Sequence, residues 1–393
     1  MNSLLVKILT AVLTFAIGVG VASLWLASRR VESVFAPVPT ETATARLEIV
    51  FVLDTTGSMG GLLDGAKQRI WGIVNDIMQE SHSSVKIGLV AYRDHGDDYV
   101  TQLLPLTEDL DKVYSTLMDY RAAGGGDAPE DVRAALAEGL YKAGWSAANP
   151  NLTQIIFLVG DAPPHENYHD EQDALTSATE AVQKGIIVNT IQCGFSDETR
   201  RSWESIARFG HGQYFAIPAD GGVQAITTPY DQQLGELAGR LGATFISYGF
   251  ADEADAEAKR TAVARQAQAV ETKIALAAPW RAKAERALNK VANSEAYVGD
   301  LLQNIENGTV KPENLDPASL PEQLQSMSPA KRQQEIERRL AERREIRAQI
   351  VSLSKQRADY IAAEEKNGGN KEAGFDAVVS KEVQRQMRRT TGF

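Results

Sequence analysis

The stretch RLEIVFVLDTTGSM, residues 46–59, decides the fold. Its first eight residues are mostly apolar and rich in β-branched side chains, which is typical of a buried strand. After the strand, side-chain oxygens recur at Asp54, Thr56 and Ser58. Gly57 lets the chain curl, so these three side chains can turn toward one point. We therefore expect a polar loop at the carboxyl end of a central strand.

Strands and helices alternate on the carboxyl side of this stretch. We predict further strands at residues 85–92, 99–106, 152–160, 186–194 and 213–217, and helices at 61–80, 110–120, 129–143, 171–184, 197–209 and 228–241. This alternation predicts an α/β fold with a doubly wound, Rossmann-like and mostly parallel sheet. In such a fold the binding site lies at the carboxyl ends of the strands, near the point where strand order reverses.

Further oxygen donors follow other predicted elements. Asp161 comes directly after the strand at 152–160, and Asp127 lies in the glycine-rich loop at 123–131. Hydroxyls and carboxylates are hard oxygen donors, which suit Mg²⁺, Mn²⁺ or Ca²⁺ better than zinc or copper. A simple helix cap is the ordinary alternative for Asp54 and Ser58. The second aspartate at a central strand end favours a metal site over caps.

The segment Asp54-Thr55-Thr56-Gly57-Ser58 resembles the metal-ion-dependent adhesion site (MIDAS) motif, Asp-x-Ser-x-Ser, of the von Willebrand factor A (VWA) domain family. The resemblance implies that Asp54, Thr56, Ser58 and Asp161 line a metal. The loop GGGDAPE at 124–130 is similar to the hemicentin-like and α-kinase-associated members, and it implies Asp127 where most members have a threonine. The resemblance covers residues 46–245 and implies a Rossmann-like fold, a divalent metal and protein binding rather than catalysis.

We expect the site to hold Mg²⁺, with Mn²⁺ or Ca²⁺ as alternatives, and to bind a protein ligand. An acidic side chain of that partner would replace a water on the metal. We expect no enzymatic activity. Two alternatives stay open. One is a zinc hydrolase that uses His165, Glu166 and His169 of the HENYH segment. The other is a scaffold protein whose metal site is degenerate.

The chain of 393 residues is acidic, with 52 Asp and Glu against 41 Lys and Arg and a formal net charge of −11. Most of the excess lies in residues 44–250, where 28 acidic residues face 14 basic ones. Such a chain is a poor candidate for binding nucleic acid, because phosphate contacts need basic patches. The single cysteine, Cys193, excludes an internal disulfide and lies in an apolar run typical of a buried strand.

Residues 8–27 contain no charged side chain and are long enough to span a bilayer as a helix. We therefore expect residues 1–30 to form a single-pass membrane anchor, in which Lys7 precedes the apolar run, and residues 31–45 to form a linker. A Pro/Thr-rich linker after an N-terminal anchor is typical of exported proteins, so we expect the body to lie outside the cytoplasm. A cleaved signal peptide is the alternative.

Residues 251–393 are rich in Ala, Glu, Gln, Lys and Arg, and they predict an α-helical, partly coiled-coil-like tail. We expect helices at 251–293, 329–365 and 375–389. In the heptad register that starts at Ile336, arginines interrupt the apolar seam at Arg339, Arg343 and Arg357. A helical hairpin, or a docking surface for a partner, is therefore favoured over a homodimeric coil. The tail is similar to the C-terminal region of bacterial proteins with a VWA domain.

Overall fold

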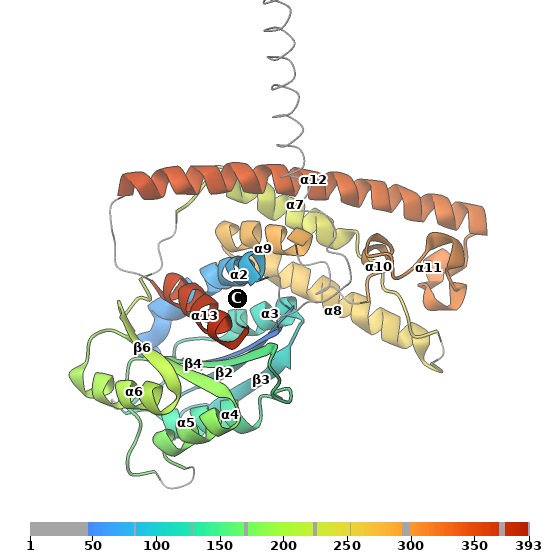
Figure 1. Cartoon of the computed structure of the whole chain (residues 1–393). Helices are drawn as coiled ribbons and strands as arrows, with labels where there is room; N and C mark the ends of the chain where they lie inside the picture. Colours follow the sequence, from blue (N-terminus) through green and yellow to red (C-terminus); the bar gives the residue numbers. More distant parts are fainter. Residues whose placement is uncertain are drawn as a thin grey trace, which may run out of the picture. The chain divides into compact units, whose positions relative to one another are not determined.

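The sheet at the centre of the α/β region has six strands (Figure 1). The computed structural model describes residues 46–81, 84–126, 129–168, 172–222, 226–251, 253–292, 299–368 and 374–391. The strands are β1 (Arg46–Asp54), β2 (Ser84–Tyr92), β3 (Thr101–Thr107), β4 (Leu152–Gly160), β5 (Ile186–Cys193) and β6 (His211–Ile217). Their order is β3-β2-β1-β4-β5-β6, and all neighbours are parallel except β2 and β3. The predicted doubly wound, mostly parallel sheet is confirmed.

The strand order reverses between β1 and β4. The chain first adds β2 and β3 on one side of β1, and then returns to place β4 on its other side. In the register of this sheet, Asp54 lies opposite Tyr92 of β2, and Leu53 lies opposite Val159 of β4. The loops after β1 and β4 therefore leave the sheet side by side, at the edge where α/β folds bind ligands.

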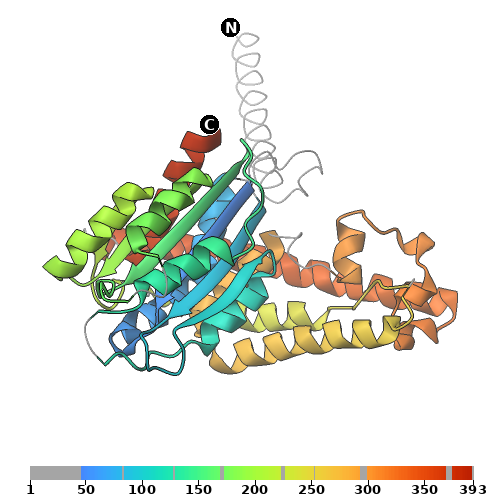
Figure 2. The ribbon, with the colours of Figure 1, turned by 90° about the horizontal axis from the view of Figure 1, so that it is seen from below.

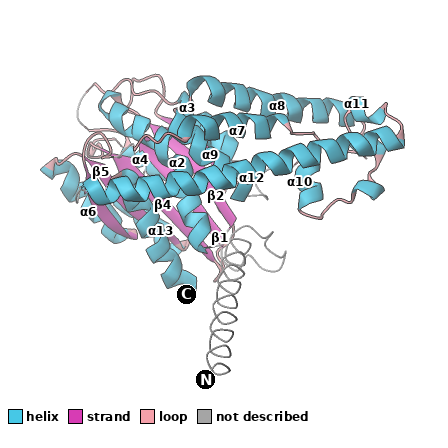
Figure 3. Cartoon of the chain, turned by 90° about the horizontal axis from the view of Figure 1, so that it is seen from above, coloured by secondary structure: helices cyan, strands magenta, loops and turns pink. Residues whose placement is uncertain are grey.

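Helices cover both faces of the sheet (Figure 2 and Figure 3). One face carries α4 (Val132–Tyr141), α5 (Ala174–Gln183) and α6 (Asp197–Phe209), and the other carries α2 (Gly60–Ser81) and α3 (Leu110–Asp119). Successive side chains of a strand point to opposite faces. Accordingly, Ile49, Phe51 and Leu53 pack with α2, whereas Val50 and Val52 pack with α4. Because both faces of the sheet are buried, the sequence of β1 is an almost continuous apolar run.

The tail consists of helices that pack onto the α/β region and onto one another. The tail helices are α8 (Ala256–Ala277), α9 (Trp280–Ala292), α10 (Leu301–Glu306), α11 (Glu322–Gln325), α12 (Pro329–Gly368) and α13 (Phe375–Thr391), with short 3₁₀ turns η2 (Pro312–Asn314) and η3 (Pro317–Ser319). Several of them pack against α7 (Asp231–Ala243), which precedes the tail. The helix expected at 251–293 is instead two helices. They part before Pro279, because proline lacks an N–H and clashes with the preceding helical turn.

The heptad seam of α12 packs inside the chain, against α7 and α9. Ile346 and Ile350 are buried there. Two arginines of the seam form ion pairs with buried carboxylates. Arg343 Nη2 lies 2.5 Å from Asp300 Oδ2, and Arg357 Nε lies 2.7 Å from an oxygen of Asp231. The arginines that make a homodimeric coil unfavourable therefore have partners within the same chain.

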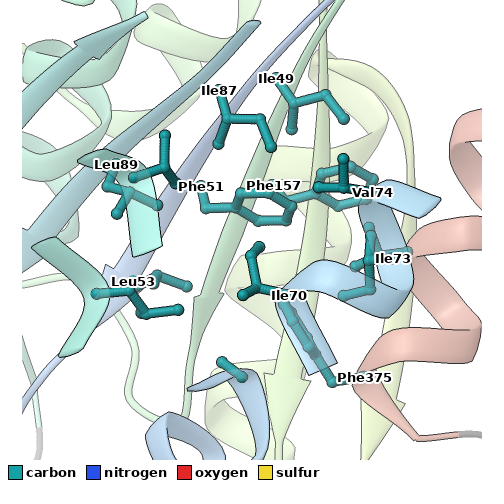
Figure 4. Packing of buried hydrophobic residues seen from close by; sticks show 14 of the residues in the cluster. Ile49, Phe51, Leu53, Ile70, Ile73, Val74, Ile87, Leu89, Phe157 and Phe375 are labelled. Carbon is teal, nitrogen blue, oxygen red and sulfur yellow. The ribbon is translucent and has the colours of Figure 1, made fainter. Parts of the chain in front are cut away.

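The C-terminal helix α13 belongs to the core of the α/β region. Phe375 is 2% exposed and packs against Phe51, whose ring in turn stacks on Phe157 (Figure 4). Further along α13, the side-chain amides of Gln386 and Asn189 of β5 exchange hydrogen bonds of 2.7 and 3.2 Å. Residues near the end of the chain thus complete a core that starts at residue 47.

The expected single-pass membrane protein is corrected. In the part of the chain that the structure describes, no helix is both long enough and apolar enough to cross a membrane. The longest described helices, α2, α8 and α12, are long enough but carry several charged side chains each, whereas a bilayer core needs about 20 mostly apolar residues. The segments expected to form the anchor and the linker, residues 1–30 and 31–45, lie outside the described residues.

Candidate functional site

The loop after β1 folds back onto the carboxylate that ends the strand. Asp54 is fully buried, and its Oδ1 accepts hydrogen bonds from the backbone N–H of Thr56 at 2.8 Å and from Thr56 Oγ1 at 2.6 Å. Thr56 Oγ1 in turn lies 3.4 Å from Ser58 Oγ, at the start of the short turn η1 (Gly57–Met59). The sequence prediction that Asp54, Thr56 and Ser58 turn toward one point is therefore supported by their geometry.

Asp161 follows β4, and its neighbour Gly160 brings β4 close to Asp54. A Cβ atom added at Gly160 would lie 3.0 Å from Asp54 Cβ and 2.5 Å from the hydroxyl of Tyr92. The backbone carbonyl of Asp161 accepts a 2.9 Å hydrogen bond from Thr199 Oγ1, which ties its loop to α6. Glycine at position 160 is thus required by close packing beneath the site.

The glycine-rich loop covers the β1 loop. Gly57 N donates to the carbonyl of Gly124 at 3.2 Å, and Ala123 N donates to the carbonyl of Thr55 at 3.1 Å. Gly124 and Gly125 have φ of 77° and 78°, a conformation that glycine adopts without strain. Asp127, the expected ligand from this loop, lies outside the described residues.

The same loop brings a second buried carboxylate, Glu130, to the site. A Cβ added at Gly125 would lie 3.1 Å from Thr56 Cβ and 3.2 Å from Glu130 Oε1, so both side chains flank one point. Glu130 is 4% exposed. The sequence prediction did not include Glu130, and Asp127, which it named, lies outside the described residues. The signal was present, because Glu130 stands where the glycine loop enters α4.

At this site the buried oxygens Asp54 Oδ2 and Glu130 Oε2 have no hydrogen-bond partner among the described residues. Burial, reinforced by the neighbouring Asp161, raises the pKa of Asp54 to about 7. Burial together with Asp54 and nearby aspartates raises the pKa of Glu130 to about 9. An unpaired carboxylate in such surroundings is costly. Proton uptake or a bound cation would relieve that cost.

Tyr92, at the end of β2, adds a buried hydroxyl beneath the site. Its side chain is fully buried, and its oxygen has no hydrogen-bond partner among the described residues. Burial and the surrounding carboxylates raise the pKa of Tyr92 well above its usual range, so the hydroxyl stays protonated. A protonated phenol can donate a hydrogen bond toward the carboxylates but carries no charge of its own.

The donor set at this edge fits a hard divalent cation. It comprises the carboxylates of Asp54, Glu130 and Asp161 and the hydroxyls of Thr56 and Ser58, all of them oxygen donors. Across the described ranges, no group of three or more His, Cys, Asp or Glu side chains converges in a way that could hold a metal ion. A site here would therefore depend on the hydroxyls, and on ligands such as water, as well as on carboxylates.

The described residues of the HENYH segment are not helical, whereas a zinc hydrolase motif needs a helix. Residues 165–168 run through a non-helical loop, and the next helix, α5, starts at Ala174. His165 directs its two ring nitrogens to Asp94 Oδ2 and Asn167 Oδ1, each at 3.1 Å. His169 lies outside the described residues. The loop geometry disfavours the H-E-x-x-H interpretation, which places both histidines on one helix face.

Comparisons with known proteins agree with this fold. A family model described as "von Willebrand factor A domain" matches residues 48–229. A putative ariadne-like RING finger protein, R811, of Acanthamoeba polyphaga mimivirus is 31% identical over 126 residues, which are 31% of this chain and 11% of that protein. Von Willebrand factor A domain-containing protein 7 of Homo sapiens is 29% identical over 199 residues, 51% of this chain and 21% of that protein.

The chain thus matches only 11% and 21% of the length of these two relatives. Among solved structures, the SpRpn10 VWA domain is 16% identical and aligns with a TM-score of 0.33, over 44% of this chain and 88% of that domain. The segment matched by the family model starts in β1 and ends just before α7, so it contains the whole sheet and the candidate site. Residues 48–229 of this chain therefore match the von Willebrand factor A domain family.

Proposed function

We propose that this chain is a divalent-cation-dependent protein-binding module and not an enzyme. In this proposal Asp54, Thr56, Ser58 and Asp161 hold Mg²⁺, or Mn²⁺ or Ca²⁺ in its place. Glu130 adds a carboxylate from the glycine loop, and Asp127 remains a proposed ligand outside the described residues. When bound, the cation offers a coordination position to an oxygen of the partner protein.

One observation carries the proposal. Asp54 is fully buried, one of its oxygens is held by Thr56, and the other has no partner among the described residues. A buried charge is normally paired or bound to a metal. Thr56 fixes the carboxylate so that only Oδ2 is available, and Ser58 and Glu130 lie around the same point. This arrangement is what a cation that retains an exchangeable ligand would use.

The chain's own residues would orient the site rather than carry out chemistry on a substrate. The two hydrogen bonds from Thr56 fix the direction of the Asp54 carboxylate, and backbone hydrogen bonds hold the glycine loop against the β1 loop. The proposed partner contributes an acidic side chain, whose oxygen replaces a water on the cation. The match to the VWA family supports a protein partner, because VWA domains are commonly protein-interaction modules.

Calorimetric titration of the full chain with Mg²⁺ and Mn²⁺ tests the cation site. We expect saturable binding that is lost in Asp54→Asn and in Asp161→Asn. Asp359→Asn on α12 is the matched control, because Asp359 is an exposed carboxylate outside the α/β region, and it should bind as the wild type does. A wild-type chain that binds neither ion would instead support a scaffold with a degenerate site.

Water-proton relaxation of the Mn²⁺-loaded chain tests the exchangeable ligand. We expect an acetylated Gly-Asp-Gly peptide to lower the relaxation enhancement, because its carboxylate displaces a water from the manganese. The Gly-Asn-Gly peptide is the control and should have no comparable effect. Equal responses to the two peptides would contradict an acidic partner side chain while leaving the cation site in place.

A further inference from the structure

Asp94, which follows β2, differs from the open carboxylates of the candidate site. It is 6% exposed, and the hydroxyl of Tyr168 lies 3.0 Å from each of its two oxygens. His165 Nε2 lies 3.1 Å from Oδ2. Asp54 and Glu130 each keep one oxygen without a partner among the described residues. The hydrogen bonds to Asp94 make it suited to holding other groups in place rather than to binding a cation itself.

Three aromatic rings form a stack over Asp94. The ring of Tyr168 lies between those of His95 and His165, with centroid distances of 4.2 and 4.1 Å and interplanar angles of 10° and 23°. At the outer end, His95 Nε2 lies 3.0 Å from Asp131 Oδ2. The three rings come from the loops after β2 and β4, and Asp131 caps α4. The stack therefore connects the loop after β2, the loop after β4 and the start of α4.

Backbone hydrogen bonds join these segments directly to the proposed ligands. Glu130 N donates to the carbonyl of Pro163 at 3.0 Å, and His165 N donates to the carbonyl of Glu130 at 3.2 Å. The loop that begins with Asp161 is thus paired with the segment that carries Glu130. On the other side, Gly125 N donates to Asp97 Oδ2 at 3.1 Å. A shift of the turn that carries Asp94 would therefore move the loop that begins with Asp161 and the segment that carries Glu130 relative to Asp54.

We propose that Asp94, clamped by His165 and Tyr168, is a positioning residue that sets the distance of Asp161 and Glu130 from Asp54. The proposal rests on the proposed cation-binding function. Groups that orient metal ligands without touching the metal typically contribute about 10- to 100-fold to its affinity. We therefore expect the clamp to tune cation affinity, although none of its three side chains is a proposed ligand.

Mn²⁺ binding to full-length variants tests the clamp. Tyr168→Phe keeps the stacked ring but removes the hydroxyl that contacts Asp94, and Asp94→Asn removes the charge. We expect both to weaken Mn²⁺ binding about 10-fold or more, and to change the zero-field splitting in the electron paramagnetic resonance spectrum of bound Mn²⁺. A loss of stability alone would lower the melting temperature without changing either readout for the folded protein.

Two matched controls distinguish a change in the positions of the proposed ligands from a general loss of stability. Tyr141→Phe removes a tyrosine hydroxyl that donates to Glu180 of α5 and accepts from Gln172, and that has no hydrogen bond to Asp94. Asp231→Asn alters a buried carboxylate at the start of α7, which Thr228 and Arg357 contact. Tyr141→Phe should leave both readouts unchanged, and Asp231→Asn should lower the melting temperature but leave Mn²⁺ affinity unchanged.

The outcomes distinguish the clamp from the function on which it rests. If the wild type binds Mn²⁺ and Asp54→Asn abolishes binding, while Tyr168→Phe and Asp94→Asn bind with wild-type affinity and spectrum, the clamp is refuted and the cation site stands. If the wild type binds no Mn²⁺, both proposals are refuted together. Weakened binding with a changed spectrum in the clamp variants alone supports the inference.

Discussion

Replacing Asp54 by asparagine should stabilise the metal-free protein at alkaline pH. The substitution keeps the shape of the side chain and an oxygen that can accept the hydrogen bonds from Thr56, but it removes the charge. In the native protein this carboxylate is fully buried, and one of its oxygens lacks a partner among the described residues. The ionised form of Asp54 therefore opposes folding when no cation is present.

The magnitude follows from the pKa. Burial raises the pKa of Asp54 from 3.8 to about 7, so the folded state holds the proton more tightly than the unfolded state. The stability that the protonated group provides is complete below pH 4 and is lost as the pH rises through 7. At about 1.4 kcal/mol per pKa unit, the wild type loses about 2 kcal/mol by pH 5 and about 4 kcal/mol by pH 8.

Urea denaturation with excess chelator at pH 5 and pH 8 measures the effect. We expect Asp54→Asn to gain about 2 kcal/mol more over the wild type at pH 8 than at pH 5. With saturating Mg²⁺ the order should reverse, because only the wild type gains stability from the ion. Asp359→Asn serves as the control and should follow the wild type. A difference between Asp54→Asn and wild type that is the same at both pH values would refute the reasoning.

Two further predictions concern packing around the site and between the α/β region and the tail. Arg286→Met should lower the free energy of unfolding by about 3–5 kcal/mol in urea denaturation, because the arginine is 1% exposed and pairs with Asp111 and Glu271. Arg388 is exposed, so Arg388→Met should change this free energy little. Gly160→Ala should lower the free energy of unfolding by about 1–3 kcal/mol, because the new Cβ would lie 2.5 Å from the Tyr92 hydroxyl. Gly126→Ala is the control, because a Cβ there would meet open space. Equal melting temperatures of the two variants would contradict this prediction.

The buried Arg286 network shows why tail packing escaped sequence analysis. Arg286 of α9 donates to Asp111 Oδ1 of α3 at 2.6 Å and to both oxygens of Glu271 of α8, at 2.8 and 3.0 Å. These residues are up to 175 positions apart, and in sequence each belongs to an ordinary charged helix face. The sequence pattern predicted an α-helical, partly coiled-coil-like tail and gave no sign of buried charge. The structure buries part of that charge where the tail meets the α/β region.

The candidate site was easier to predict because its signals are local. Asp54, Thr56 and Ser58 lie within five residues, and a curled loop after a strand brings them together whatever the rest of the chain does. Asp161 could be added because parallel strands present their carboxyl ends at the same edge. That Glu130 lies near Thr56 could not be predicted from sequence, since the direction in which a glycine loop folds depends on its contacts with the β1 loop.

By itself, then, the sequence determined the alternation of strands and helices, the doubly wound and mostly parallel sheet, and the polar loop of Asp54, Thr56 and Ser58 after the first strand. These follow from hydrophobic periodicity and turn residues, which act over a few positions. Only the tertiary structure decided that Asp94, His165 and Tyr168 form a clamp, that Glu130 faces Thr56, and that α13 fills a core begun in β1. Contacts between distant segments depend on how whole faces pack, and no local pattern records which faces meet.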